Sequence, residues 1–194
     1  MKTKLFNLII FALLTLTACN QQKSEESKEM KETTAVSESP DYASFDKNVQ
    51  IIRSLYKAHE DENLEALRGL LADTLKWSPP YYNGNKWLGK TDYLAALENY
   101  HKDFDNIKFQ EGLTMGDSLV NGMWSGSVFP KDQASSTPDA IRVYGTWTAT
   151  HTESGKEVGV KYFSLCWINE AGKISQYTNY FDVHGLEAQL AAEE

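Results

Sequence analysis

The chain has 194 residues, of which 41% are hydrophobic and 12% aromatic, and its formal net charge at pH 7 is −8. This length supports one well-packed core and is too short for two large domains. The acidic balance, without a basic patch interleaved with aromatic residues, excludes nucleic acid as an expected partner, because binding a phosphate backbone requires clustered Lys and Arg side chains.

The first residues predict an export signal. Lys2 and Lys4 precede an apolar run over residues 5–18, which is shorter than the roughly 20 residues that a membrane-spanning helix needs. The run ends in the sequence LTAC, which closes at Cys19 and resembles a bacterial lipobox. We therefore expect residues 1–18 to be a signal peptide that is cleaved before a lipidated Cys19. The alternative is an ordinary signal peptide that happens to contain a cysteine.

A polar segment separates this signal from the rest of the chain. Residues 20–40 contain no aromatic residue and almost no side chain that could be buried, so residues 19–44 are expected to form a lipidated, disordered tether. Without Lys2 and Lys4, 17 basic residues face 27 acidic ones, a formal charge of −10. Membrane association is therefore expected from the lipid alone. The expected location is the cell envelope, at the outer membrane. The sequence does not distinguish its periplasmic face from its surface face.

Three helices are predicted next. Residues 45–60 begin near Asp46, a good N-cap, and place five side chains on one helical stripe: Val49, Ile52, Leu55, Tyr56 and His59. Residues 61–71 repeat this apolar spacing. A third helix is expected over residues 91–104, with Thr91 as its N-cap. Between the second and third helices, Pro79 and Pro80 exclude a continued helix and predict a short strand followed by an ordered loop.

The remaining chain predicts strands joined by short turns, which is typical of an antiparallel meander. The expected strands cover five ranges: 107–115, 118–129, 140–152, 157–169 and 173–182. A short helix follows, because Val183, Leu186, Glu187 and Leu190 fall at helical spacing. Helices followed by a sheet and a last helix make an α+β fold class.

Three stretches together resemble the nuclear-transport-factor-2-like superfamily, which includes the SnoaL-like polyketide cyclases and the ketosteroid isomerases. They are HEDENLEALRGLLADTLKW from His59, GKTDYLAALENY from Gly89 and GKISQYTNYFDVHGLEAQL from Gly172. The resemblance implies one domain over residues 45–194, in which a curved antiparallel sheet wraps as a cone around about three N-terminal helices, with a short C-terminal helix. It also implies an internal pocket and, commonly, homodimers packed through the outer sheet face. The same scaffold hosts enzymes, carriers and interaction domains.

The resemblance suggests where catalytic residues could lie. Ketosteroid isomerases carry an Asp before a Pro on the first strand, whereas here Ser78 precedes Pro79, so the catalytic base of that family has no counterpart at this position. Tyr56 could correspond to the oxyanion-binding Tyr of that family. SnoaL-like cyclases use a late Asp, and by position Asp182 is the nearest candidate.

Two interpretations of Asp182 stay open. If the last strand stays extended to His184, then Tyr180, Asp182 and His184 share one face as a donor, a base and its partner for catalysis. If Asp182 instead ends the strand as the N-cap of a helix, its carboxylate is held ionised by backbone N–H groups and is a weak general base. The helical spacing that follows favours the cap.

The excess of aromatic residues predicts a wall for a flat apolar ligand, or else a cone filled by its own side chains. The candidate ligand-binding residues are Tyr56, Trp77, Tyr81, Tyr82, Trp87, His101, Trp124, Trp147 and Tyr180. His59 and His151 are expected to be solvated, and Cys166 to be buried in the core. No His pair has the spacing of a metal site and no phosphate-binding loop occurs, so neither a metal nor a cofactor is expected.

The sequence therefore favours a lipid-anchored envelope protein that binds a small apolar or aromatic molecule without catalysis. One alternative is a SnoaL-like enzyme that uses Asp182 for proton transfer, as a cyclase, isomerase or dehydratase. The other is a dimeric protein-interaction domain.

Overall fold

The computed structural model describes residues 43–115, 118–120, 122–125 and 140–193. The predicted signal peptide, the lipidation of Cys19 and nearly all of the predicted tether lie outside these residues. None of the helices that the structure describes is both long enough and apolar enough to cross a membrane.

Helix α1 (Ala43–Glu60) packs its apolar stripe into the core, where Ile52 and Leu55 are almost completely buried. The helix already includes Asp46, so the prediction of this residue as the N-cap is wrong. Its carboxylate lies in the first turn, where the helix dipole favours negative charge. Helix α2 (Leu64–Leu70) begins after Asn63, whose side chain accepts a hydrogen bond from the Ala66 N–H at 2.9 Å.

Helix α3 (Lys90–Asp103) starts one residue before the predicted cap. Its N-cap is Gly89 rather than Thr91, and the Gly89 N–H donates to the Asp92 carboxylate at 2.9 Å. The acidic residue three positions after the cap therefore satisfies the backbone N–H of the cap residue. Strand β1 (Leu71–Ser78) and the loop after it agree with the prediction from the two prolines.

The main sheet has the strand order β1-β8-β7-β6-β2, and β5 also pairs with β6. Its other members are β2 (Phe104–Glu111), β5 (Met123–Ser125), β6 (Ile141–His151), β7 (Glu157–Ile168) and β8 (Ile174–Phe181). The short strands β3 (Leu113–Met115) and β4 (Ser118–Val120) form a separate pair. The predicted strand over residues 107–115 is thus divided at Gly112, whose φ of 127° interrupts the extended backbone.

One pair of strands differs from the predicted antiparallel sheet. Strands β1 and β8 run parallel, so the sheet is mixed. Parallel strands require a long crossover connection, and here nearly the whole domain lies between the two strands. The sequence interpretation considered neighbouring strands only and could not detect this pair.

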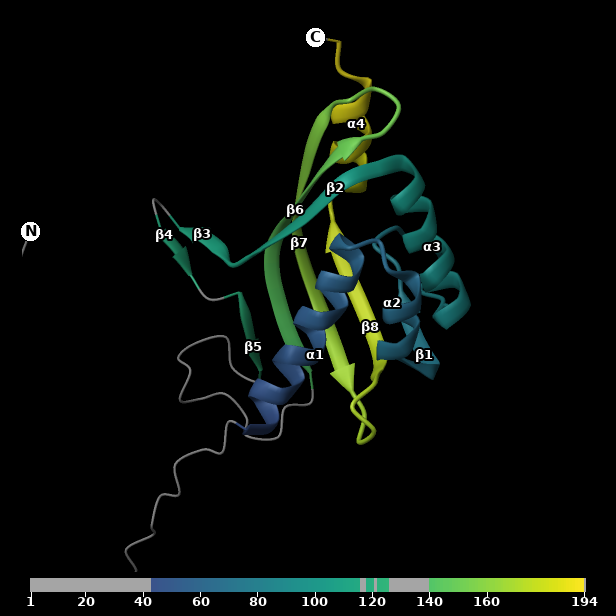
Figure 1. The fold of residues 1–194 in the computed structure, drawn as a ribbon, viewed down its shortest axis with the longest axis vertical. Coiled ribbons are helices and arrows are strands. Elements are labelled where there is room, and N and C mark those ends of the chain that lie inside the picture. The colour runs from purple at the N-terminus through teal and green to yellow at the C-terminus, as the bar shows by residue number, and fades with distance from the viewer. Residues whose placement is uncertain (1–42, 116–117, 121, 126–139, 194) are drawn as a thin grey trace, which may run out of the picture. The chain divides into compact units, whose positions relative to one another are not determined.

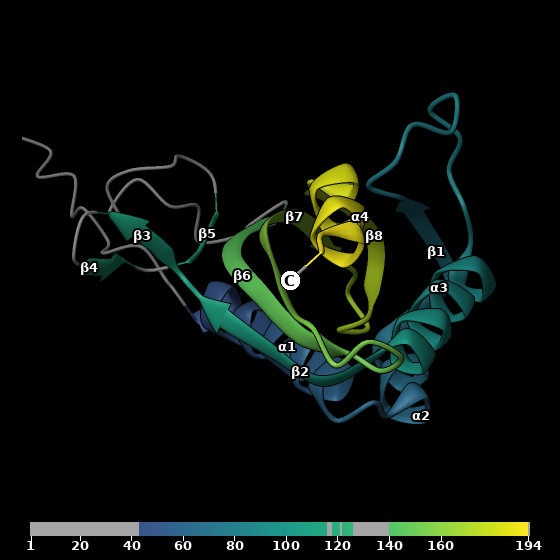
Figure 2. The same ribbon diagram turned by 90° about the horizontal axis from the view of Figure 1, so that it is seen from above.

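The sheet curves around an interior that the helices close on the other side (Figure 1 and Figure 2). Helix α4 (Val183–Ala191) lies at the end of the sheet where the β6–β7 hairpin turns (Figure 1). It is held there by Gln189, whose side chain bonds both the N–H and the C=O of Gly159, at 2.9 and 3.0 Å, and by Lys156, whose ammonium donates to the Leu190 carbonyl at 2.7 Å. The predicted α+β fold class, with a curved sheet, N-terminal helices and a short C-terminal helix, is confirmed.

Candidate functional site

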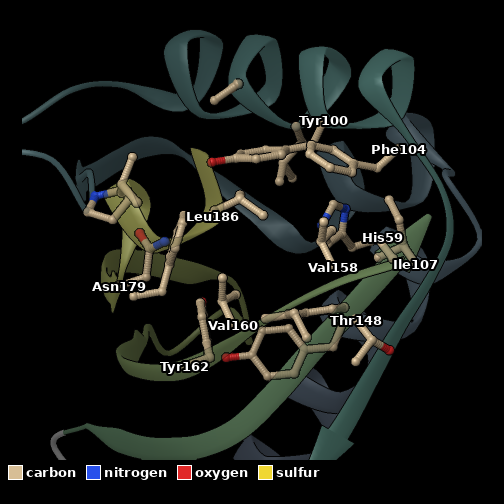
Figure 3. A pocket seen from close by; sticks show the side chains of 18 of the residues that line it. His59, Tyr100, Phe104, Ile107, Thr148, Val158, Val160, Tyr162, Asn179 and Leu186 are labelled. Atoms are coloured by element: carbon tan, nitrogen blue, oxygen red, sulfur yellow. The ribbon is translucent and has the colours of Figure 1, made fainter. Parts of the chain in front are cut away.

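A cavity of about 170 Å³ lies inside the curved sheet (Figure 3). Helix α1 contributes Leu55, Tyr56 and His59 to its wall, and α4 contributes Val183 and Leu186 at one end. Engineered apolar cavities of about 150 Å³ bind benzene. The cavity is therefore large enough for a molecule with a single ring.

The wall of the cavity carries no formal charge at neutral pH. Among the described residues that line it there is no Asp, Glu, Lys or Arg, and His59 is the single imidazole. Because an unpaired buried charge costs far more free energy than a hydrogen-bonded neutral group, a wall without a charged partner favours an uncharged ligand.

Four buried tyrosines meet at one side of the cavity: Tyr56, Tyr93, Tyr162 and Tyr177. The Tyr56 hydroxyl is 2.8 Å from Ser164 Oγ, and the hydroxyls of Tyr162 and Tyr177 are hydrogen-bonded to each other. Burial raises the pKa of all four phenols above their usual value. The cluster therefore presents neutral hydroxyl groups, of which the sequence interpretation had singled out Tyr56 alone.

Cys166 lies beside this cluster. It is fully buried, as predicted, and burial raises the pKa of its thiol to about 12. The thiol is therefore protonated at neutral pH and is not a nucleophile.

His59 is half-buried and lies in the cavity wall, so the prediction that it is solvated is wrong. Its ring lies in the cavity wall, its centroid 5.0 Å from that of Trp147, and it stacks on His101 at 4.9 Å with its Nδ1 2.8 Å from His101 Nε2. Burial, and after it the neighbouring His101, lowers the pKa of His59 to about 3. The imidazole is neutral at pH 7. The signal was present in the sequence, because His59 continues the apolar stripe of α1 through Leu55 and Tyr56.

Four of the predicted ligand-binding residues line the cavity: Tyr56, Trp77, Tyr81 and Trp147. His101 lies behind His59 instead, and contacts the cavity through it. Trp124 belongs to β5, but its side chain lies outside the described part of the structure.

The other three predicted aromatic residues do not line the cavity. Tyr82 and Trp87, on the loop before α3, are 84% and 50% exposed. Tyr180 is 54% exposed and stacks on Phe163, on the opposite face of the sheet from the cavity. The reason is a bulge at Ser175: Ile174 pairs with Ile168 and Gln176 with Trp167, so one extra residue shifts the alternation of the strand. After it, Tyr177 points inward and Tyr180 outward.

The structure does not bring Tyr180, Asp182 and His184 together at the cavity. Asp182 is the N-cap of α4, and its Oδ1 accepts the Gly185 N–H at 2.7 Å, which confirms the cap interpretation. The catalytic interpretation required the strand to stay extended as far as His184. The strand ends before that residue, because α4 begins at Val183. The His184 side chain is 93% exposed and lies 3.5 Å from the Glu187 carboxylate. Within the described residues, no three His, Cys, Asp or Glu side chains are grouped as a metal site would need.

A comparison with known protein families and with curated proteins found no match. Solved structures do match. A nuclear-transport-factor-2-like protein of unknown function from Burkholderia pseudomallei is 16% identical, with a TM-score of 0.55 over 75% of this chain and 98% of that one. A protein from Catenulispora acidiphila with a ketosteroid isomerase-like fold, solved with trimethylamine, is 11% identical, with a TM-score of 0.53 over 72% and 91%.

An LEH-like epoxide hydrolase from Mycobacterium tuberculosis is 13% identical to this chain, with a TM-score of 0.50 over 75% of this chain and 90% of that one. At such low identities these structures establish the fold and leave the activity open. The described domain has the fold of the nuclear-transport-factor-2-like and ketosteroid isomerase-like proteins.

Proposed function

We propose that this domain binds a small, uncharged, apolar or aromatic molecule in its cavity and holds it without chemical change. The observation that carries the proposal is the cavity of about 170 Å³ with an aromatic and uncharged wall. Aromatic side chains such as Trp77 and Trp147 offer a large apolar contact area, which suits a flat ring.

The competing proposal is that the domain is an enzyme. The similarity of its fold to that of an epoxide hydrolase is the reason to consider it. General acid–base chemistry needs a group whose pKa lies near the working pH and which reaches the substrate. Asp182 caps α4, and the buried His59 has a pKa of about 3, so its unaided imidazole is a weak base. No carboxylate stands among the described residues of the cavity wall. This inventory supports binding over catalysis.

Toluene is a suitable probe, because it is neutral and has a single ring. We expect the full chain to bind it with a Kd of about 0.1–1 mM, which corresponds to about −4 to −5.5 kcal/mol. Ala96→Phe places a ring in the cavity wall and should weaken binding at least about tenfold, because the added volume occupies the site. Protein NMR shifts of the tryptophan indole groups, followed during titration, measure both constants.

Ala95→Phe is the matched control. Ala95 is the preceding residue of α3 and is exposed, so the same substitution adds its ring to the surface. Binding should stay as in the unaltered chain. Equal affinities of the Ala96 and Ala95 variants, or no binding of toluene to the unaltered chain, would contradict the proposal.

The tether adds a proposal about location. The basic residues, the apolar run and the LTAC sequence support lipid attachment at Cys19, which would hold the domain at the outer membrane by its lipid alone. In a bacterium that processes lipoproteins, we expect the chain to enter the membrane fraction, and Cys19→Ala to move it to the soluble fraction. Mass spectrometry of the N-terminal peptide supplies the direct check, since an unmodified Cys19 in the mature chain rules the anchor out.

A further inference from the structure

His59 is a polar group with a fixed position in an otherwise mostly apolar wall. The edge of Trp147 and the stacked ring of His101 hold its imidazole from two sides. Figure 3 shows this ring in the pocket wall, beside Val158 and Ile107. A ligand in the cavity therefore meets an imidazole whose orientation is set before binding.

The two nitrogens of this imidazole have different surroundings. Nδ1 is hydrogen-bonded to His101 Nε2 at 2.8 Å. Within the part of the chain that the structure describes, Nε2 has no protein partner. Nε2 is not one of the buried unpaired side-chain atoms of the described residues, so it is accessible, and a ligand in the cavity can bind it.

The His59–His101 pair is not explained by packing. Nδ1 of His101 is buried and has no hydrogen-bond partner among the described residues. Such an unsatisfied atom costs free energy, and two apolar side chains of similar size would fill the same space without it. The pair therefore points to a use for the imidazole in binding.

The chemistry of the pair restricts the ligand group. Each neutral imidazole has one N–H and one lone pair, and either ring can supply the hydrogen of the shared bond. His59 Nε2 is an acceptor when His59 donates to His101, and a donor when His101 donates to His59. A hydroxyl group fits both states because it donates and accepts, whereas a carbonyl or ether oxygen fits one of them.

We propose that the preferred ligand is a single-ring compound with a hydroxyl group, such as a phenol or a ring enol, and that this hydroxyl binds Nε2 of His59. His101 is a positioning residue, because its hydrogen bond with Nδ1 orients the His59 ring and leaves Nε2 for the ligand. This inference rests on the proposed function and adds the chemical class of the ligand to it.

Phenol and toluene are matched probes, since they share the ring and differ in a hydroxyl and a methyl group. The quantity to measure is the ratio of their affinities for the full chain. We expect His59→Phe to shift this ratio about tenfold or more towards toluene, because a buried hydroxyl then loses its partner. His184→Gln removes an exposed imidazole that does not line the cavity and should leave the ratio unchanged.

Nitrogen NMR of the histidine side chains gives a second measurement that needs no variant. Phenol should move the Nε2 resonance of His59, and toluene should leave its protonation pattern as it is. His101→Phe removes the partner of Nδ1, so it should change the nitrogen chemical shifts of His59 and reduce the preference for phenol, which a merely structural role of His101 would not do.

The outcomes separate the two proposals. If toluene and phenol both bind and His59→Phe leaves their ratio unchanged, the hydroxyl inference is overturned while the proposed binding function stands. If phenol binds without moving the Nε2 resonance, the inference is likewise overturned. If neither compound binds the unaltered chain, the proposed function fails and the inference fails with it.

Discussion

Acidification from pH 7 to pH 5 should lower the free energy of unfolding by about 2 kcal/mol through His59. In the unfolded chain a histidine has a pKa of about 6.5, whereas burial holds the folded His59 at about 3. The unfolded state therefore binds more protons throughout this window, and stability falls as pH decreases below the unfolded pKa. Each pH unit between the two values costs about 1.4 kcal/mol. Urea unfolding at both pH values measures the difference.

The titratable groups around His59 also contribute to the loss of stability between pH 7 and pH 5. On α3, His101 has its own pKa lowered, first by burial, and the Glu62 carboxylate, which follows α1, acts on it in the opposite direction. His101 therefore adds to the loss on acidification. Carboxylic acids titrate mainly below this window, with ordinary pKa values of about 4, so histidines dominate the change between pH 7 and pH 5.

His59→Phe tests the assignment. The variant should lose about 2 kcal/mol less than the unaltered chain over the same pH range, since the removed group no longer takes up a proton on unfolding. A pH dependence equal to that of the unaltered chain would show that His59 is not held neutral in the folded state.

Alkaline conditions should destabilise the domain even more strongly. Four buried tyrosines of the cavity wall have a pKa raised by burial: Tyr56, Tyr93, Tyr162 and Tyr177. Their folded pKa lies above the unfolded value of about 10. Their contribution to the free energy of unfolding is therefore fully present below pH 10 and is lost as pH rises towards the folded pKa values. Between pH 9 and pH 11 each phenol costs about 1.4 kcal/mol, or about 5 kcal/mol for the four. Cys166 adds to this loss, because burial raises its pKa to about 12.

This loss is comparable to the whole stability of many domains, about 5–15 kcal/mol. We therefore expect cooperative unfolding near pH 11, with tyrosinate absorbance appearing together with the loss of circular dichroism. Tyr93→Phe should reduce the loss between pH 9 and pH 11 by about 1.4 kcal/mol, because one phenol is removed. Ionisation of all tyrosines in a chain that stays folded would contradict the prediction.

The two predictions provide controls for each other. His59→Phe removes no phenol and should keep the alkaline loss, and Tyr93→Phe removes no imidazole and should keep the loss on acidification. A variant that altered both ranges would indicate general damage to the fold instead of the removal of one buried titratable group.

Local chemistry in the sequence was sufficient for several features. The spacing of Val183, Leu186 and Leu190 predicted α4, and the choice of Asp182 as its cap follows because a carboxylate satisfies the free N–H groups of a first turn. The stripe from Val49 to His59 likewise predicted the buried face of α1. Such signals involve residues a few positions apart, whose spatial relation is fixed once the backbone is helical.

The side chains that form the cavity could be assigned only in part. Tyr56, Trp77, Tyr81 and Trp147 were found, because large aromatic residues are good candidates for the wall of an apolar cavity. Tyr180 was assigned to the wrong face, since a single bulge at Ser175 reverses the alternation and leaves no clear sign in the sequence. His59 was placed on the correct stripe but expected in solvent, because its burial comes from Trp147 and His101, which are distant in the chain.

The sequence by itself determined most of the helices and strands, the helical spacing of α4 and that the domain is α+β, because these depend on periodicity over a few residues. The tertiary structure decided the parallel pairing of β1 with β8, the direction of the aromatic side chains and the uncharged character of the cavity. These depend on strand register and on burial by distant segments. The pairing of His59 with His101 is the clearest case, since residues 42 positions apart share one hydrogen bond.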